Sequence, residues 1–546
     1  MEDIGINNIA DLLAPRWNKQ KIKTFDNQAF DALFQIENIP LSWFYKRLLS
    51  FHTIPPQFQT KQLVLKYLNK EEIKYSSEID TKRKKLQKLY FLNEKVKIAL
   101  YGNKKVNLPA EKPNVLLLTY LDHANQEGEI FRLNNLLKIM KEDQILHPLT
   151  ITATPPSKKF YSTIKKQYHS ENNFYHFINA ENKGKAKIMA RELSGKWLSL
   201  TEDDKINLLK DPALWNCVRY PFDFYFSYEF MYSLILCYLT YKKIFQQKHL
   251  KAAVITSQHN IYERCLNAAA SKYKIPVILI QHGAGTGSIN PELLPPYTIT
   301  ALSDHYKKLL MEKKVSEKDI LVSGPLIFDD IFPFVEKKQH KNQNKATKIL
   351  ILTVPFVEQN YFSTEKHQEY ISSMLREIQK VPNTQIIIKL HPLEKNLKDY
   401  QKIIDLNTFQ NITVVQKTGA SYLYQLMSES NIVINFSSTV VLESVILDKP
   451  IITMISKEFQ NPFNAIITES KATIEVAELG NLSSEITKLL TDEKVQQELH
   501  QNRIAFKEKF CGKIDGQAAA RVAAFVKQLV QDNKDNKEIS RTRKRK

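Results

Sequence analysis

Residues Ile255–Gly283 read ITSQHNIYERCLNAAASKYKIPVILIQHG, and this stretch decides which fold the whole sequence supports. It begins at the end of a short apolar run, continues as an alanine-rich helical pattern, and reaches a second apolar run, Val277–Gln281. Both runs are apolar throughout instead of alternating, as in parallel strands that are covered on both faces. A strand, a helix and a second parallel strand form the repeating unit of α/β proteins.

The same pattern extends in both directions from this stretch. Apolar runs predict further strands before and after it, and a second series of strands follows a charged segment. The first series comprises Asn114–Tyr120, Pro148–Thr154, Ala252–Ser257, Val277–Gln281, Tyr297–Ala301 and Asp319–Gly324, and the second comprises Ile349–Val354, Gln385–Leu390, Ile412–Val415, Asn431–Phe436 and Pro450–Met454. We therefore predict an α/β fold of two Rossmann-like, doubly wound domains, whose ligands bind at the carboxyl ends of the strands.

The strand series also predicts the domain boundaries. Residues 1–110 are expected to form a mostly helical N-terminal extension, since they show no alternating strand pattern, followed by the first Rossmann-like domain at 111–334. Residues 335–348 are a charged linker, 349–516 the second Rossmann-like domain, and 517–546 a C-terminal helix with a basic tail. Two or more domains are also what a chain of 546 residues requires, since single hydrophobic cores stop growing well below that length.

The charge balance points to negatively charged partners. The net charge is +20 and the composition is that of an ordinary folded protein, with 43% hydrophobic and 25% charged residues. No basic module with interleaved aromatic residues is present, so we expect a sugar nucleotide or an anionic membrane surface as partner and no nucleic acid.

Cysteine spacing and the apolar runs bear on localisation. The four cysteines, Cys217, Cys237, Cys265 and Cys511, form no metal-ligand or disulfide pattern, which suits a reducing compartment. The N-terminus has no secretion signal, and the most apolar stretch is about half of the ~20 residues needed to span a bilayer. We expect a cytoplasmic protein with at most peripheral contact with the inner face of the cell membrane.

A glycine-rich segment follows directly on the strand Val277–Gln281. It reads QHGAGTG, and Gly283 and Gly285 allow the backbone to turn sharply and approach a ligand closely. His282 stands where the strand opens toward the cleft between the domains. It is either a catalytic or ligand-binding residue or a histidine that caps a turn.

The second domain carries two motifs of the same kind. KLHP ends the strand Gln385–Leu390, where the imidazole of His391, beside Lys389, can donate a hydrogen bond to a phosphate oxygen. The dipeptide His-Pro within this motif also occurs by chance in protein sequences. FSSTVVLES follows the strand Asn431–Phe436 and places three hydroxyl side chains at the start of a helix. These are Ser437, Ser438 and Thr439, which predict either an anion site or an ordinary helix cap.

Taken together, these segments resemble a known group of enzymes. The strand, the alanine-rich helix, the Ile-Pro step and QHG, followed in order by KLHP and FSST, are similar to bacterial surface-polysaccharide transferases with the GT-B layout. This group includes capsule polysaccharide biosynthesis proteins, CDP-glycerol glycerophosphotransferases and bacterial sialyltransferases. The resemblance covers about residues 250–460. It implies that residues 111–334 form the acceptor side, that 349–516 bind the nucleotide-sugar donor, that His391 contacts the phosphate and that Glu443 holds the ribose.

The catalytic base is left open between several residues of the first domain. The loop LDHANQEGEIF follows the strand Asn114–Tyr120, and its Glu127 resembles the second acid of the motif that supplies the base in bacterial sialyltransferases. Gln126 replaces the first acid of that motif. A carboxylate at a helix start is also stabilised by the helix dipole alone. Asp122 and His123 of the same loop, and His282, are the competing candidates.

The predicted function is inverting, metal-independent transfer of a sugar from a nucleotide-activated donor to a surface polysaccharide or lipid-linked glycan. No acidic pair stands at a strand end to hold a divalent metal, and we expect no cofactor, since the nucleotide-sugar acts as co-substrate. CDP-glycerol-type phosphotransfer is the alternative reaction, although its enzymes tend to carry Asp-Tyr before the serine pair. A 2-epimerase should show a Gly-rich SGG segment followed by paired glutamates.

A third alternative is a non-catalytic protein of the same fold that binds a membrane. It rests on the aromatic segment Trp43-Phe44-Tyr45, within the amphipathic stretch Ile39–Phe51, and on the basic tail Arg541–Lys546. Packing of the aromatic segment on the body of the protein is the competing interpretation.

Overall fold

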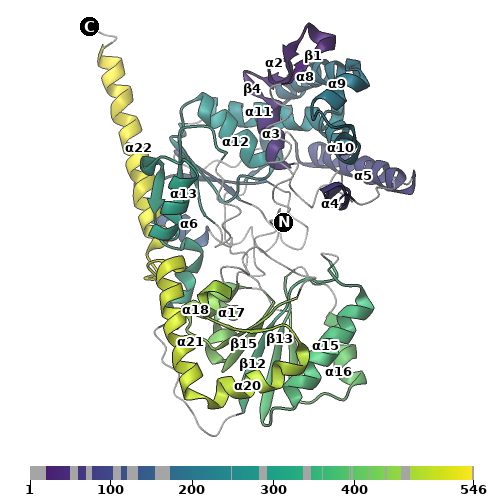
Figure 1. Cartoon of the computed structure of the whole chain (residues 1–546). Coiled ribbons are helices and arrows are strands. Elements are labelled where there is room, and N and C mark those ends of the chain that lie inside the picture. The colour runs from purple at the N-terminus through teal and green to yellow at the C-terminus, as the bar shows by residue number, and fades with distance from the viewer. Residues whose placement is uncertain are drawn as a thin grey trace.

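The computed structural model describes most of the chain. The described residues are 20–48, 60–68, 70, 77–102, 112–119, 133–153, 172–247, 249–281, 292–335, 346–358, 361–392, 394, 397–416, 419–436, 440–456 and 468–543. The two halves of the molecule each contain one large parallel sheet (Figure 1).

The first sheet has seven strands, and every pairing in it is parallel. The strands are β5 (Val115–Thr119), β6 (Pro148–Thr152), β7 (Asn172–Asn173), β8 (Ala252–Ile255), β9 (Val277–Leu279), β10 (Tyr297–Ala301) and β11 (Ile320–Val322). Their order is β11-β10-β9-β8-β5-β6-β7, so the chain reverses its direction of winding between β5 and β8. Ligands of such sheets bind at this switch point.

The second sheet repeats this topology with six parallel strands. They are β12 (Thr347–Leu352), β13 (Thr384–Lys389), β14 (Ile412–Val415), β15 (Ile432–Asn435), β16 (Ile451–Met454) and β17 (Ile474–Val476), in the order β14-β13-β12-β15-β16-β17. The predicted fold class of two doubly wound domains is confirmed, and every predicted strand forms. The unpredicted strands β7 and β17 are short and lie at sheet edges, where little apolar sequence is needed.

Helices from local crossovers cover both faces of the second sheet. One face packs against α15 (Thr364–Gln379), α16 (Leu397–Leu406), α20 (Leu482–Thr491) and α21 (Glu493–Phe506). The other face packs against α17 (Ala420–Glu429) and α18 (Val440–Ile446). Alternate strand residues serve the two layers, since Ile349 and Ile351 join the first cluster and Leu350 and Leu352 the second.

The first sheet receives one of its layers from the far end of the chain. On one face lie α11 (Tyr228–Gln247) and α12 (Ile261–Lys272), and on the other α6 (Asn134–Glu142) and α22 (Ala518–Arg543). Val522, Val526 and Val530 of α22 are fully buried against strand residues such as Val115 and Val254. Figure 1 shows α22 running from the second domain along the side of the first. The predicted C-terminal helix is therefore structurally part of the first domain.

Polar contacts fix the start of α22. Both carboxylate oxygens of Asp329 accept hydrogen bonds from backbone N–H groups of the first turn, at 3.1 Å from Ala518 and 2.7 Å from Ala519. Arg521 forms a bidentate pair with Asp515 and donates to the carbonyl of Ser323 at 2.7 Å. A carboxylate of the first domain, 189 residues before Ala518 in the chain, thus caps the N-terminus of α22.

The N-terminal extension and a long insertion between β7 and β8 form a helical layer beside the first sheet. The insertion contributes α8 (Ala180–Ser199), α9 (Glu202–Asn207), α10 (Pro212–Tyr225) and α11, and the extension contributes α2 (Phe30–Leu33), α3 (Leu41–Leu48), α4 (Thr60–Leu68) and α5 (Ser77–Tyr101). The described part of the extension is mostly helical but also holds short strands. Two small antiparallel pairs are present, formed by β1 (Lys21–Ile22) with β2 (Gln28–Ala29) and by β3 (Gln35–Ile36) with β4 (Ile39–Pro40).

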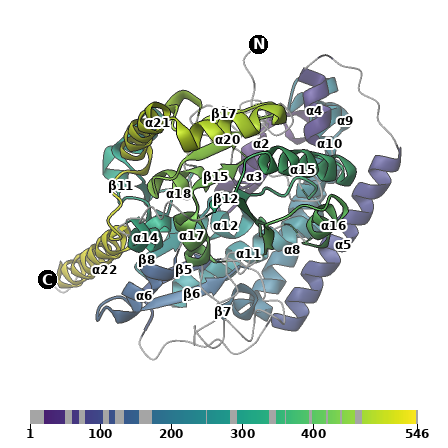
Figure 2. The same ribbon diagram turned by 90° about the horizontal axis from the view of Figure 1, so that it is seen from below.

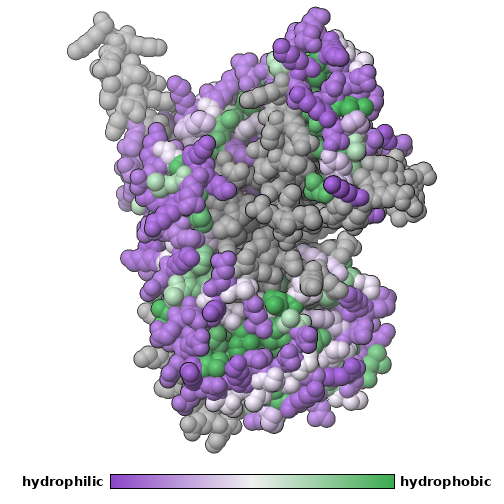
Figure 3. Space-filling view, viewed as in Figure 1, coloured by the Kyte–Doolittle hydropathy of each residue, from purple (hydrophilic) through white to green (hydrophobic). Residues whose placement is uncertain are grey.

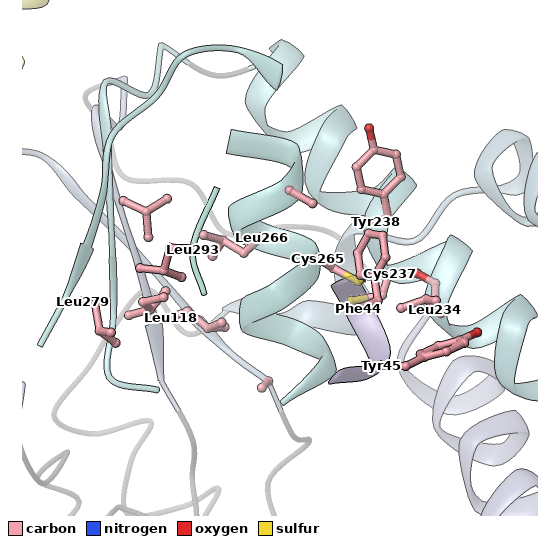
Figure 4. Packing of buried hydrophobic residues seen from close by; sticks show 14 of the residues in the cluster. Phe44, Tyr45, Leu118, Leu234, Cys237, Tyr238, Cys265, Leu266, Leu279 and Leu293 are labelled. Atoms are coloured by element: carbon pink, nitrogen blue, oxygen red, sulfur yellow. Dashed lines mark hydrogen bonds between the residues drawn. The ribbon is translucent and has the colours of Figure 1, made fainter. Parts of the chain in front are cut away.

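The aromatic segment of α3 packs inside the protein. Phe44 and Tyr45 are fully buried, and the Tyr45 hydroxyl donates to the carbonyl of Tyr225 at 2.8 Å. Figure 4 shows both side chains among residues of α11 and α12, including Tyr238 and Cys265. Insertion of Trp43-Phe44-Tyr45 into a membrane is thereby contradicted, because these rings already serve the core.

The outer surface is mostly polar. Figure 3 shows hydrophilic residues over most of the described surface on that side of the molecule. None of the described helices is both long and apolar enough to cross a bilayer. All four cysteines are buried free thiols.

Candidate functional site

The carboxyl ends of three neighbouring strands meet at the switch point of the second sheet. β12 lies between β13 and β15, and Leu352 pairs with Lys389 on one side and with Asn435 on the other. Asn435 is fully buried, and its amide donates to the carbonyl of Ile452 and to the hydroxyl of Thr453, both at 3.2 Å. This bonding fixes the end of β15, the strand that leads into residues 437–439.

The turn that carries His391 is held by a dense set of hydrogen bonds. The backbone N–H of His391 donates to the Thr353 hydroxyl at 3.0 Å and to Oε2 of Glu394 at 2.7 Å. The N–H of Glu394 donates back to the His391 carbonyl at 3.0 Å. The N–H of Leu390 donates to the Val415 carbonyl at 2.9 Å. His391 is thus presented by a turn whose backbone is tied to β12 and β14.

Glu394 is the centre of this network. Its carboxylate is almost wholly buried and accepts hydrogen bonds from the hydroxyls of Thr353 and Tyr400, the latter at 2.7 Å, as well as from the His391 N–H. His367 of α15 lies 3.1 Å from the Tyr400 hydroxyl. Burial raises the pKa of Glu394, although the three donors act in the opposite direction.

The electrostatics around His391 keep its imidazole neutral. Burial, and secondly the cation of Lys389, lower the pKa of His391 to about 4. A neutral imidazole offers one N–H to a phosphate oxygen. Lys389 itself is buried, and its ammonium donates to the Leu390 carbonyl at 2.8 Å, while burial lowers its pKa. The structure therefore brings these two predicted residues together at one strand end.

Glu443 lies in the first turn of α18, where its chemistry differs from that of an exposed carboxylate. The residue as a whole is only partly buried, but its Oε2 atom is buried and makes no hydrogen bond to a described residue. Burial raises the pKa of Glu443 to about 8. The carboxyl group is thus mostly protonated at neutral pH and can act as a donor to a hydroxyl oxygen. Ser437, Ser438 and Thr439, just before this helix, lie outside the described residues.

The first-domain candidates also lie outside the described residues. They are Asp122, His123 and Glu127, and His282 with Gly283 and Gly285. The residue before His282 is described and firmly held: the Gln281 N–H donates to the Thr300 hydroxyl at 2.9 Å, and its side-chain oxygen accepts from the Leu302 N–H at 3.1 Å. The roles of these candidates stay predictions.

The far end of the His282 segment is held by the N-terminal extension. The Glu292 N–H donates to the Gln258 side chain at 3.1 Å, and the Glu292 carbonyl accepts from the Trp43 indole at 2.9 Å. Arg264 is buried and lies over the Trp43 ring at 4.2 Å from its centroid, with Glu292 at 3.5 Å. Trp43 therefore links α3 to the chain that leaves the glycine-rich segment.

Sequence reasoning missed several residues of this arrangement. Glu394 stands three residues after His391 in HPLE, so an acid at this spacing was a signal that could have been used. Thr353 and Tyr400 come from segments 38 residues before and 9 residues after His391, and nothing local links them to it. Within the described part of the chain, no group of three or more His, Cys, Asp and Glu side chains could hold a metal ion.

Comparison with known proteins supports the relation to sugar-nucleotide enzymes. A family model described as UDP-N-acetylglucosamine 2-epimerase matches residues 297–527, which run from β10 through the second sheet into α22. No curated protein sequence matches the chain. Over these residues the chain is thus similar to an enzyme family that acts on a nucleotide-sugar.

Several solved structures are similar at low identity. A Staphylococcus aureus MnaA–UDP co-structure is 11% identical, with 77% of this chain and 97% of that chain covered and a TM-score of 0.49. A UDP-GlcNAc 2-epimerase from Neisseria meningitidis bound to UDP-GlcNAc is 14% identical, with 76% and 99% covered and a TM-score of 0.48. The wall teichoic acid polymerase TagF is 12% identical, with 82% and 97% covered and a TM-score of 0.43. Likenesses at this level do not assign a reaction.

Proposed function

We propose that the protein is a glycosyltransferase that moves a sugar from a nucleotide-activated donor to a surface polysaccharide or lipid-linked glycan. The nucleotide would bind at the switch point of the second sheet, and the acceptor would be activated from the first domain. The observation that carries the proposal is the fixed turn at the end of β13, where buried Glu394 holds the backbone of His391 at the sheet edge on which doubly wound folds bind ligands.

Each donor-side residue has a proposed task. His391 donates an N–H to a phosphate oxygen, and the approach of that anion raises its pKa from about 4, which strengthens the bond. Ser437, Ser438 and Thr439 add hydroxyl and backbone donors, and Lys389 contributes positive charge from behind the turn. The protonated Glu443 donates to a ribose hydroxyl.

On the acceptor side, Glu127, Asp122 or His282 removes the proton of the acceptor hydroxyl, which typically accelerates transfer by about 10²–10⁴-fold.

The direct test is a panel of CMP-, UDP-, GDP- and CDP-linked donors, read by the shift in melting temperature of the full-length protein. We expect one nucleotide class to stabilise the wild type. His391→Ala should weaken that nucleotide by about tenfold to a hundredfold, the effect of losing one hydrogen bond to a charged group. The matched control is His500→Ala, since His500 lies on the outer helix α21 with its Nδ1 atom 2.8 Å from Asp448. Absence of any shift at millimolar donor would contradict the proposal, as would unchanged affinity in His391→Ala.

A second candidate function is epimerisation of a nucleotide-sugar, favoured by the family match over residues 297–527. The segment FSSTVVLES argues against it, because the expected Gly-rich segment and paired glutamates are missing. Incubation with UDP-N-acetylglucosamine alone separates the two, with the configuration at C2 followed by NMR. Inversion at C2 without an acceptor would identify an epimerase. Transfer requires an acceptor and leaves free nucleotide.

A further inference from the structure

The long helix α5 has one face that is firmly attached to the protein. The Phe91 ring stacks on Phe224 with centroids 5.2 Å apart, and Arg83 lies over the Tyr220 ring at 4.8 Å. Glu94 accepts a hydrogen bond from the Tyr175 hydroxyl at 2.8 Å. Figure 2 shows α5 along the outer edge of the molecule. These contacts determine which of its side chains point away from the protein.

The opposite face of α5 exposes a continuous apolar stripe. The exposed fractions are 37% for Leu86, 54% for Leu89, 59% for Leu92, 44% for Val96 and 59% for Leu100. Steps of three and four residues place these side chains on one side of a helix. Of the twelve large apolar residues that are exposed in the described part of the chain, five are on this one helix. Such clustering marks an interaction site, whereas scattered exposed apolar residues need no explanation.

Lysines accompany the stripe, and no exposed acid does. Lys84, Lys85, Lys88 and Lys95 are exposed beside it. Between Thr81 and Leu100 the only acid is Glu94, which is partly buried and paired with Lys97 at 2.7 Å. The solvent-facing side of this part of α5 therefore combines leucine, valine and positive charge. We call it the leucine–lysine face, defined by Leu86, Leu89, Leu92, Val96 and Leu100 with these four lysines.

We propose that the leucine–lysine face of α5 docks on the surface of an anionic lipid bilayer. A helix of this kind lies in the plane of the interface, with its apolar side chains about 5–10 Å deep and its lysines near the lipid phosphates. The stripe from Leu86 to Leu100 spans about 21 Å along the helix axis. A nucleic acid would be met by charge alone and would leave the leucines exposed to water. The inference does not depend on the transfer reaction proposed above.

The test uses the full-length protein and sedimentation with two kinds of vesicle, phosphatidylcholine alone and an equal mixture of phosphatidylcholine and phosphatidylglycerol. We expect binding to the mixed vesicles that weakens as salt is raised. The triple variant Leu89→Ser, Leu92→Ser, Val96→Ser should bind at least about tenfold more weakly, since its apolar contact area is lost. Lys88→Glu with Lys95→Glu should lose affinity by at least about tenfold as well.

The matched control is Ile188→Ser with Leu198→Ser, because these residues of α8 are 69% and 77% exposed and are not on α5. It should bind like the wild type, and circular dichroism should show all variants folded. Binding by the triple variant equal to the wild type would overturn the proposal, as would absence of wild-type binding to the mixed vesicles. Self-association abolished by the triple variant, without vesicle binding, would instead identify the face as a protein contact and equally overturn it.

A local probe sharpens the test. A fluorophore attached to Leu92→Cys should shift its emission to the blue when mixed vesicles are added, whereas one attached to Leu198→Cys should not. The four native cysteines are buried, so labelling is directed to the introduced thiol. Equal shifts at both positions would contradict docking through α5.

Discussion

The two parallel sheets share one strand order, yet they are completed in different ways. The second sheet is covered by helices that connect its own neighbouring strands or directly follow its last one, and a buried carboxylate ties the turn after β13 to the sheet. The first sheet depends on segments distant in sequence: α22 from the far end of the chain covers one face, and α3 from the N-terminal extension holds the chain that follows the glycine-rich segment. A repeated topology can therefore be assembled locally in one half of a molecule and non-locally in the other.

The largest expected effect is the loss of stability when the packing of α22 against the first sheet is disrupted. Val522→Asp places a charge in the fully buried layer between α22 and the strands, and should lower the free energy of unfolding by about 3–5 kcal/mol. Ala524→Asp is the matched control, because Ala524 is exposed on the same helix. Urea unfolding of both variants measures the difference. Equal stability of the two variants would show that α22 is dispensable for the first sheet.

The next effect concerns the locally held site of the second sheet. Glu394→Ala removes the acceptor of two hydroxyls and one backbone N–H, and should cost about 2–4 kcal/mol, since three hydrogen bonds to a buried carboxyl group are lost. Glu394→Gln keeps one oxygen and should cost clearly less. The free energy of unfolding in urea measures both. If Glu394→Ala is as stable as the wild type, the turn of His391 is held by other contacts.

An effect of intermediate size is expected from Glu443, whose raised pKa should make the stability of the protein depend on pH. Its pKa in the folded state, about 8, is above the usual 4.5, so the folded protein holds a proton that the unfolded chain releases. Stability of the unliganded protein should therefore fall as the pH rises from about 4.5 to 8. Glu443→Gln should flatten this part of the melting-temperature profile and also weaken nucleotide binding. A profile identical to that of the wild type would place the carboxyl of Glu443 in water.

The smallest effect is expected from the ion pair that joins α22 to the first domain at its surface. Lys527 lies 2.8 Å from Asp143, and their side chains are 36% and 21% exposed. Solvent screens such pairs, so Lys527→Ala should cost no more than about 1 kcal/mol in thermal or urea unfolding. A loss as large as that of Val522→Asp would mean that charge, and not apolar packing, attaches α22.

Sequence patterns were sufficient for the strands and for part of the site. Uninterrupted apolar runs predicted every strand of the two large sheets except β7 and β17, and KLHP lies at the end of one of the predicted strands. The reason is that both signals are local, since strand burial and the residue at a strand end follow from a few consecutive positions. The edge strands β7 and β17 and the short pairs of the extension have no such run and were missed.

The sequence alone did not predict which polar side chains are buried. Nothing in the order of residues showed that Glu394 would face Thr353 and Tyr400, or that the carboxyl of Glu443 would be buried with a raised pKa. The aromatic segment of α3 was equally ambiguous, because an amphipathic pattern of Trp, Phe and Tyr fits both a core and a membrane interface. Only the packing of Phe44 and Tyr45 against α11 and α12 decided for the core.

The sequence by itself thus determined two doubly wound sheets and the motifs at their strand ends, because periodicity and strand-end position are properties of short segments. The tertiary structure decided which distant segments complete each sheet. Apolar surface on a sheet must be covered, but the sequence of the sheet does not specify which part of the chain covers it. For the first sheet that part is α22, and for the face of α5 that points outward the described protein offers no cover.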